Sequence, residues 1–150
     1  MYFDDAFAGY PLAQRPLCRY QRMMRTLILT AAGGAMGASA RHLLSRYALH
    51  VFGPGLPMGT LMANIIGGFA MGMLAGWLAF GIDGGRELRL FLGVGLLGGF
   101  TTFSAFSLEV ALLIERKAWA AAMGYVGISV VFAIGALFVG LYISRRLFAA

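Results

Sequence analysis

The centre of the chain carries a stretch whose residues conflict with an unbroken helix: GGFTTFSAFS, residues 98–107. It lies inside an apolar segment, residues 88–114, that exceeds the roughly 20 residues needed to cross a bilayer. Two adjacent glycines followed by two β-branched threonines lower the helix propensity in the middle of this segment. Non-helical backbone at such a depth is tolerated only beside protein or water. We therefore expect a membrane helix broken near its centre, with freed carbonyl groups suited to a monovalent cation.

The composition of the whole chain agrees with a membrane location. Of the 150 residues, 60% are hydrophobic and 12% are charged, whereas soluble domains average about 25% charged residues. This excludes an ordinary soluble domain, and the high hydrophobicity excludes a wholly disordered chain. The single cysteine, Cys18, excludes a disulfide framework and a cysteine-rich metal site. The remaining class is a small polytopic membrane protein.

Four apolar segments are long enough to span a membrane: residues 26–48, 58–80, 88–114 and 118–143. Glycine- and proline-rich or polar turns separate them, at residues 53–57, 81–85 and 115–117. The sequence therefore predicts an all-α protein: a compact bundle of four transmembrane helices over residues 25–146, with the third helix broken in mid-membrane. Both termini are expected on one side, and residues 147–150 form a short tail.

Residues 1–24 differ from the rest, because they carry arginines and prolines and no long apolar run. One interpretation is a basic anchor on an anionic membrane face. The other, which we favour, is a disordered extension without a role, bypassed if translation starts at Met23 or Met24. Counted from Met23, the lysines and arginines are almost evenly divided between the two ends of the spans. The positive-inside rule then fixes no orientation, and the chain is expected to insert both ways up.

Few polar side chains lie within the spans, and they come in helical pairs. Thr60 and Asn64 share one face of the second span, and Tyr125 and Ser129 share one face of the fourth. The amide of Asn64 offers two N–H donors to an anion, or it joins two helices, a role worth about 0.6 kcal/mol. Tyr125 is equally compatible with an aromatic at the membrane interface.

The third span carries a phenylalanine stripe beside a row of hydroxyls: Phe100, Phe103 and Phe106 beside Thr101, Ser104 and Ser107. Core packing is the ordinary explanation of such a stripe, but it requires no hydroxyl row. The edges of phenyl rings are electropositive, and hydroxyl groups can donate hydrogen bonds. The two rows therefore favour a surface that accepts a small anion without a fixed positive charge.

Two further features of the third span have structural explanations. Its GVGLLG run, residues 93–98, matches the dinucleotide-binding pattern but lies inside an apolar segment, so its glycines fit close helix packing instead. Glu109 either pairs with an arginine or couples a proton. The spans contain no nucleophile–base pair, so the chain is not expected to be an enzyme.

Three segments together resemble the CrcB/Fluc fluoride channel family: GGAMGASAR at 33–41, GTLMANIIG at 59–67, and GGFTTFSAFSLE at 98–109. The resemblance covers about residues 25–146. It implies an antiparallel, dual-topology homodimer of four-helix protomers with two fluoride pores.

The resemblance also implies roles for individual residues. Asn64 looks like the asparagine whose amide faces fluoride, and Phe103 and Phe106 look like the phenylalanines whose ring edges line the ion path. The backbone carbonyls of Gly98 and Thr101 match those that hold a structural sodium ion at the two-fold axis. The residues at the positions of the family's polar track are Ser104, Tyr125 and Ser129, and Thr60 shares the face of Asn64.

Three more positions belong to the comparison with that family. Arg41 matches an arginine near the membrane edge, and Glu109 matches the glutamate after the phenylalanine motif. One turn beyond Ser129 some members carry another hydroxyl, where this chain has Ala133. Because Ala133 has no hydroxyl, one end of the polar track lacks a hydrogen-bonding side chain that those members have.

The expected function is passive export of fluoride across the plasma membrane of a microbe. The expected partners are a second copy of the chain, fluoride, membrane lipid and a structural sodium ion, and no nucleic acid. The alternative is a small proton-coupled multidrug exporter, which also has four spans. Such an exporter needs a membrane-embedded acid, normally in its first span, whereas here the one deep acid is Glu109 in the third.

Overall fold

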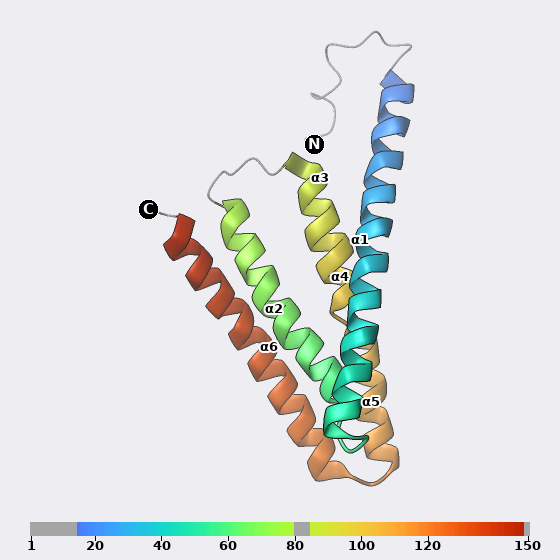
Figure 1. Cartoon of the computed structure of the whole chain (residues 1–150), viewed down its shortest axis with the longest axis vertical. Helices are drawn as coiled ribbons and strands as arrows, with labels where there is room; N and C mark the ends of the chain where they lie inside the picture. The colour runs from blue at the N-terminus through green and yellow to red at the C-terminus, as the bar shows by residue number, and fades with distance from the viewer. Residues whose placement is uncertain (1–14, 80–84, 149–150) are drawn as a thin grey trace.

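A computed structural model describes residues 15–79 and 85–148, and the regular structure in these ranges is helical (Figure 1). The elements are α1 (Arg15–Phe52), α2 (Met58–Ala79), α3 (Gly85–Arg89), η2 (Leu90–Leu97), α4 (Gly98–Phe100), α5 (Phe103–Glu115) and α6 (Trp119–Phe148). The stretch η2 is π-helical: the Gly98 N–H that closes it donates to the carbonyl of Gly93, five residues back. The expected all-α fold is confirmed.

Within the described residues, three helical rods are long and apolar enough to cross a membrane: α2, residues 85–115, and α6. The 85–115 rod contains the expected broken span. The expected first span, residues 26–48, forms the middle of α1, which is not among the three. Its C-terminal half carries Arg41, His42 and Arg46. The membrane passage of α1 therefore stays a prediction.

The first helix begins earlier than expected. Residues 15–24, expected to be disordered, form the first turns of α1. The physical reason is that arginine, glutamine, methionine and leucine favour helix, while Pro16 lies in the first turn, where proline is tolerated. Residues 1–14 lie outside the described ranges. At the other terminus α6 continues to Phe148, into the expected tail.

Two of the three expected connections are confirmed. Residues 53–57 separate α1 from α2, with Gly53 at a φ of 72°, and a short link separates α5 from α6, with Lys117 at a φ of 60°. The third, at residues 81–85, lies outside the described residues except for Gly85. The helix α6 ends at the same end of the molecule as α1 begins, as expected (Figure 1).

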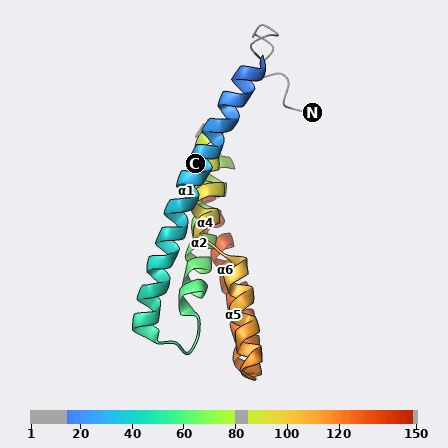
Figure 2. The same cartoon turned by 90° about the vertical axis from the view of Figure 1, so that its right-hand side faces the viewer.

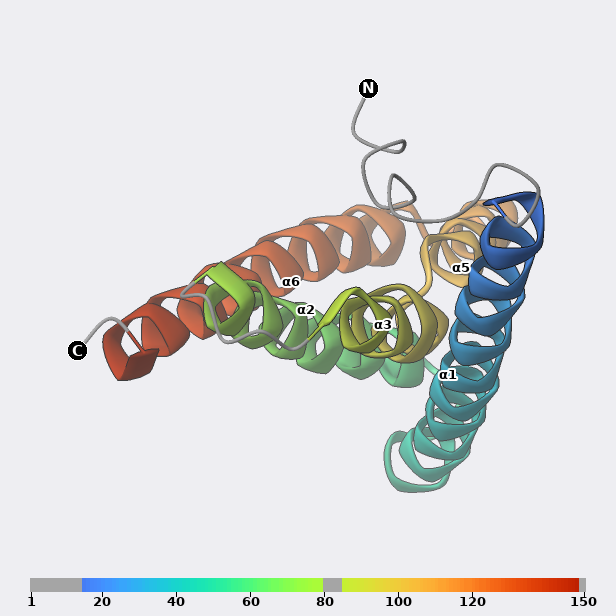
Figure 3. The ribbon, with the colours of Figure 1, turned by 90° about the horizontal axis from the view of Figure 1, so that it is seen from above.

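Glycines bring the helices into close contact. A Cβ atom on Gly95, inside the GVGLLG run, would lie 2.8 Å from the carbonyl oxygen of Thr30 in α1, and one on Gly68 would lie 2.7 Å from that of Ala133 in α6. Helix α1 therefore packs on η2 and α4, and α2 packs on α6 (Figures 2 and 3). This confirms the packing role expected for Gly95, and Gly68 packs in the same way.

The arrangement is more open than the compact bundle expected from four helices with short connections. Helix α5 packs on α6, while many large apolar side chains on the outside are exposed, among them Phe103, Phe132 and Phe138. The difference arises because the broken third rod directs α5 away from α1 (Figure 2).

Candidate functional site

The third rod breaks at two threonines. Helix α4 ends at Phe100, Thr101 and Thr102 are extended with ψ of 156° and 125°, and α5 begins at Phe103. The break is confirmed, although the adjacent Gly98 and Gly99 stay helical. The Thr101 hydroxyl donates to the carbonyl of Leu97 (2.9 Å), and the Thr102 hydroxyl accepts from the Ala105 N–H (3.2 Å). The threonine side chains thus end one helix and cap the next.

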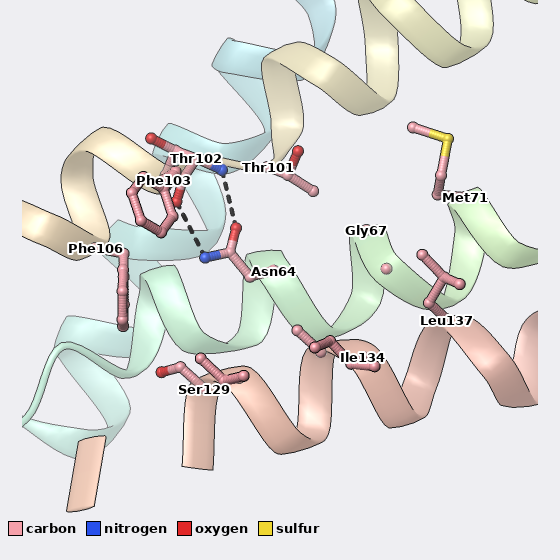
Figure 4. Close-up of a pocket in the computed structure, with 13 residues that line it drawn as sticks. Asn64, Gly67, Met71, Thr101, Thr102, Phe103, Phe106, Ser129, Ile134 and Leu137 are labelled. Atoms are coloured by element: carbon pink, nitrogen blue, oxygen red, sulfur yellow. Dashed lines mark hydrogen bonds between the residues drawn. The ribbon is translucent and has the colours of Figure 1, made fainter. Parts of the chain in front are cut away.

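Asn64 of α2 forms hydrogen bonds with the backbone at the break. Its Oδ1 accepts a hydrogen bond from the Thr102 N–H (2.9 Å), and its Nδ2 donates to the Thr102 carbonyl (3.1 Å), as Figure 4 shows. In a continuous helix the Thr102 N–H would donate to the carbonyl of Gly98. Asn64 therefore replaces a backbone partner, which is the helix-joining role, and keeps one N–H of its amide for another acceptor.

Arg41 of α1 provides a hydrogen-bond donor for a second backbone group at the break, the carbonyl of Gly99. Its Nε donates to the carbonyl of Gly99 at 3.2 Å. In an unbroken helix that carbonyl would accept from the Phe103 N–H, which the break removes. The Arg41 side chain therefore reaches the break, where this carbonyl gives the guanidinium a partner inside the protein. Its expected position near the membrane edge stays a prediction.

A groove with a volume of about 390 Å³ opens beside the break. It is lined by Asn64, Gly67, Gly68, Met71, Thr101, Thr102, Phe103, Phe106, Ser129, Val130, Ala133, Ile134 and Leu137 (Figure 4). None of these side chains is charged. The Ser129 hydroxyl is buried and has no hydrogen-bond partner among the described residues, so it can donate to a ligand. Asn64, Phe103, Phe106 and Ser129 are thereby brought together, and Ala133 lies among them.

The two phenylalanines after the break differ sharply in exposure. Phe103 is 78% exposed, whereas Phe106 is 9% exposed and contacts both Phe103 and Tyr125, with ring centroids 5.6 Å and 5.5 Å apart. Phe100 does not continue this row, because the break lies between it and Phe103. The expected stripe of three phenylalanines is therefore a pair extended by Tyr125.

Glu109 of α5 accepts hydrogen bonds from two of the predicted polar residues. Its two carboxylate oxygens accept from the hydroxyls of Thr60 (2.6 Å) and Tyr125 (2.7 Å). Both hydroxyls are turned to the carboxylate, and neither residue lines the groove. No arginine pairs with Glu109 within the described ranges. Thr60 and Glu109 instead line a separate cavity of about 180 Å³ at the turn between α1 and α2.

The remaining hydroxyls near the break bond locally. The Ser104 hydroxyl is exposed and lies 3.2 Å from that of Thr102, and the Ser107 hydroxyl donates to the carbonyl of Phe103 at 2.9 Å. Ser104 therefore stands at the first turn of α5, beside the groove, whereas Ser107 is occupied by its own helix.

The carbonyls of Gly98 and Thr101 fit the donor set expected for a sodium ion. The helical partner of the first would be the Thr102 N–H, and that of the second the Ala105 N–H. Both amides are bonded to side chains instead, to Asn64 and Thr102. Two oxygens freed from the helix are suited to a hard cation, but one chain supplies fewer oxygens than such an ion takes.

The pairings of Arg41 with Gly99, and of Thr60 and Tyr125 with Glu109, could not be derived from spacing, because they join residues 16 to 58 positions apart. A signal was nevertheless present: each is an ionisable or hydroxyl side chain inside an apolar span, where an unpaired polar group is costly.

Comparisons with known proteins place similar sequences in one family. The profile of the family described as CrcB-like protein, Camphor Resistance (CrcB), matches residues 28–141. A protein of Phenylobacterium zucineum named fluoride-specific ion channel FluC is 59% identical over 127 residues, which cover 84% of this chain and 100% of the relative. Proteins of the same name from Caulobacter vibrioides and Mesorhizobium japonicum are 53% and 50% identical, over 84% and 83% of this chain and 100% and 99% of their own lengths.

Proposed function

Because this chain belongs to the CrcB-like family, as its motifs indicated, we propose that it is a fluoride channel that lets fluoride leave the cell passively. The names of its relatives support the activity. The groove beside the break supports the place where the ion would pass.

The observation that carries the proposal is the set of neutral donors on this groove. Asn64 has an N–H left over, Ser129 has an unpartnered hydroxyl, and Phe103 and Phe106 supply ring edges. Fluoride is small and strongly hydrated, so a selective path must replace its water with matched donors. No lysine or arginine lines the groove, so the ion would not be held too tightly to leave.

The path would require a second copy of the chain. Phe103 is 78% exposed on the single chain and faces the open side of the groove. An antiparallel homodimer would cover this side, and Phe103 and Phe106 would then line the path across the interface. For a chain that starts at Met23, the nearly even numbers of lysines and arginines at the two ends of the spans would support insertion both ways up.

A sodium ion at the dimer centre would take the carbonyls of Gly98 and Thr101 from each copy. When bound, it would supply a positive potential near the ion path and hold the protomers together. The hydrogen bonds of Asn64 and Arg41 with the backbone at the break stabilise its non-helical conformation. These carbonyls therefore have no helical hydrogen-bond partner.

The hydroxyls beyond the groove would continue the path. Ser104 stands at the start of α5. Thr60 and Tyr125 would join the path by turning their hydroxyls from Glu109 to the ion, and Thr60 and Glu109 line the neighbouring cavity. We place the protein in the plasma membrane of a microbe, since its relatives come from bacteria and three of its rods can cross a membrane.

The deciding experiment is fluoride-electrode recording of efflux from proteoliposomes, with chloride-loaded vesicles as the control. We expect rapid fluoride efflux and little chloride efflux. Absence of fluoride efflux, together with uptake of a cationic dye driven by a proton gradient, would overturn the proposal in favour of an exporter in which Glu109 carries the proton.

A further inference from the structure

The first helix reaches well past the level of the other helices. The Arg41 side chain reaches the break, and Arg25 lies 16 residues before Arg41, about 24 Å along the axis at about 1.5 Å per residue. From the middle of a bilayer, the hydrocarbon ends after about 15 Å and the headgroups after about 20–22 Å. Arg25 therefore stands at the outer edge of the headgroups. Arg22 and Arg19 lie about 4.5 and 9 Å farther along the helix, within about one Debye length of the membrane surface.

Arginines of two other helices lie at the same end. Arg25 forms an ion pair with Glu87 of α3 (3.3 Å), and Arg89 donates to the carbonyl of Leu78 in α2. Arg145 and Arg146 end α6, directly after Ser144, which is bonded to the carbonyl of Met73. The Arg25–Glu87 pair is exposed, and such pairs are weak. The end of the molecule where α1 begins and α6 ends therefore carries arginines from α1, α3 and α6.

The helix dipole does not explain the arginines at the start of α1. The N-terminal end of a helix carries a partial positive charge and favours acidic side chains. The first turn of α1 contains none, and Arg19, Arg22 and Arg25 follow it.

The same segment presents an apolar face beside its basic one. Tyr20, Met23 and Leu27 recur at the i, i+3 and i+7 positions of one helix face, and all three are exposed. Tyrosine is enriched at membrane interfaces, where its ring and its hydroxyl face different layers. Cationic and interfacial apolar side chains on one short helix are typical of segments that contact anionic lipid.

We propose that the segment Arg19–Arg25, which we call the basic arm, binds the phosphate headgroups of anionic membrane lipids. It lies before residue 28, where the family match begins. Lipid binding by the arm is therefore an addition to the shared fold, and it does not depend on the proposed ion path.

The test is native mass spectrometry of the full chain in detergent, titrated with phosphatidylglycerol or phosphatidylcholine. The triple variant Arg19→Gln/Arg22→Gln/Arg25→Gln should lower the preference for phosphatidylglycerol at least tenfold, because each arginine near an anionic surface contributes about fivefold. The matched control Arg46→Gln/Arg116→Gln/Lys117→Gln removes three charges at the other end and should retain it. A triple arginine-to-lysine variant of the arm should keep most of it.

Unchanged preference in the glutamine variant of the arm, or an equal loss in that variant and in the Arg46/Arg116/Lys117 control, would overturn the proposal. So would loss of the preference in millimolar inorganic phosphate, which would indicate a site for free phosphate. Gel filtration of each variant checks the fold. Fluoride efflux is recorded separately, so a failure of the ion-path proposal leaves this result interpretable.

Discussion

Asn64 and Thr102 are joined by hydrogen bonds in both directions, with the amide oxygen accepting at 2.9 Å and the amide nitrogen donating at 3.1 Å. A side chain of one helix thus completes the backbone of another at the point where that backbone leaves its helix. Helix-joining and ion-facing roles are compatible in Asn64, because the pair uses only one of its two N–H donors.

We expect Asn64→Asp to abolish fluoride efflux from proteoliposomes. The carboxylate cannot donate to the Thr102 carbonyl, and it places a negative charge on the groove. The lost partner should also lower the free energy of unfolding in detergent by about 1–3 kcal/mol. The control Ser144→Ala removes another buried hydrogen bond, far from the break, and should cost stability while efflux persists. Undiminished efflux in Asn64→Asp would remove Asn64 from the ion path.

Replacing either phenylalanine of the groove with isoleucine should slow fluoride efflux, because isoleucine has no electropositive ring edge. Phe103→Ile should leave protomer stability nearly unchanged, since Phe103 is mostly exposed, whereas Phe106→Ile should lower it by removing two ring contacts. Cross-linking should show dimer assembly intact in both. The control is Phe138→Ile on α6, which is outside the groove; wild-type efflux in both groove variants would refute the ring-edge argument.

Arg41→Met keeps the length of the side chain and removes the donor to the Gly99 carbonyl. We expect a loss of about 1–2 kcal/mol in the free energy of unfolding, because this half-buried carbonyl loses a charged partner. Efflux should fall as well, since the break loses one of its two outside supports. Arg46→Met, on the exposed side of the same helix, should change neither quantity.

Tyr125→Phe preserves the ring contact with Phe106 and removes only the hydroxyl that donates to Glu109. Loss of a buried donor to a carboxylate should cost about 1.5–3 kcal/mol in thermal or denaturant unfolding. The exposed Tyr142 offers a matched control, and Tyr142→Phe should be neutral. Equal stabilities of the two variants would show that Glu109 does not need this partner.

Gly37→Ala should destabilise the contact of α1 with α4, because the new Cβ would lie 2.8 Å from the backbone nitrogen of Phe100. Overpacking of this kind costs about 1–3 kcal/mol. Gly34→Ala, one turn away on the same helix, has open space around its Cβ and should gain about 0.5–1 kcal/mol of helix stability. The two melting temperatures, measured in one detergent, should therefore move in opposite directions.

Local features of the fold were predictable from the sequence. Apolar length gave the helices, the glycine- and proline-rich segment at 53–57 marked a turn, and β-branched threonines located the break. The close packing of Gly95 followed from its position inside an apolar segment. The start of α1 at Arg15 was missed, because prolines and charge outweighed the helix propensity of the residues between them.

The site was predictable only in part, since its members come from four rods whose approach depends on packing. Hydroxyl and amide residues inside apolar spans could be chosen as candidates, and Asn64, Ser129 and the two phenylalanines do meet at one groove. Spacing along one helix said nothing of Arg41 meeting Gly99, or of Thr60 and Tyr125 turning to Glu109. The expected phenylalanine row assumed one continuous helix through Phe100.

The extended pair Thr101 and Thr102 has a mechanical consequence. Any change in the angle between α4 and α5 is concentrated in the four backbone torsions of these two residues, because the helical hydrogen bonds on either side resist bending. Asn64 is hydrogen-bonded to the backbone of Thr102, and Arg41 is hydrogen-bonded to the carbonyl of Gly99, just before the pair. The neighbouring helices α1 and α2 therefore restrain these torsions, so α5 can change its angle to α4 only if the hydrogen bond from Arg41 or those with Asn64 break.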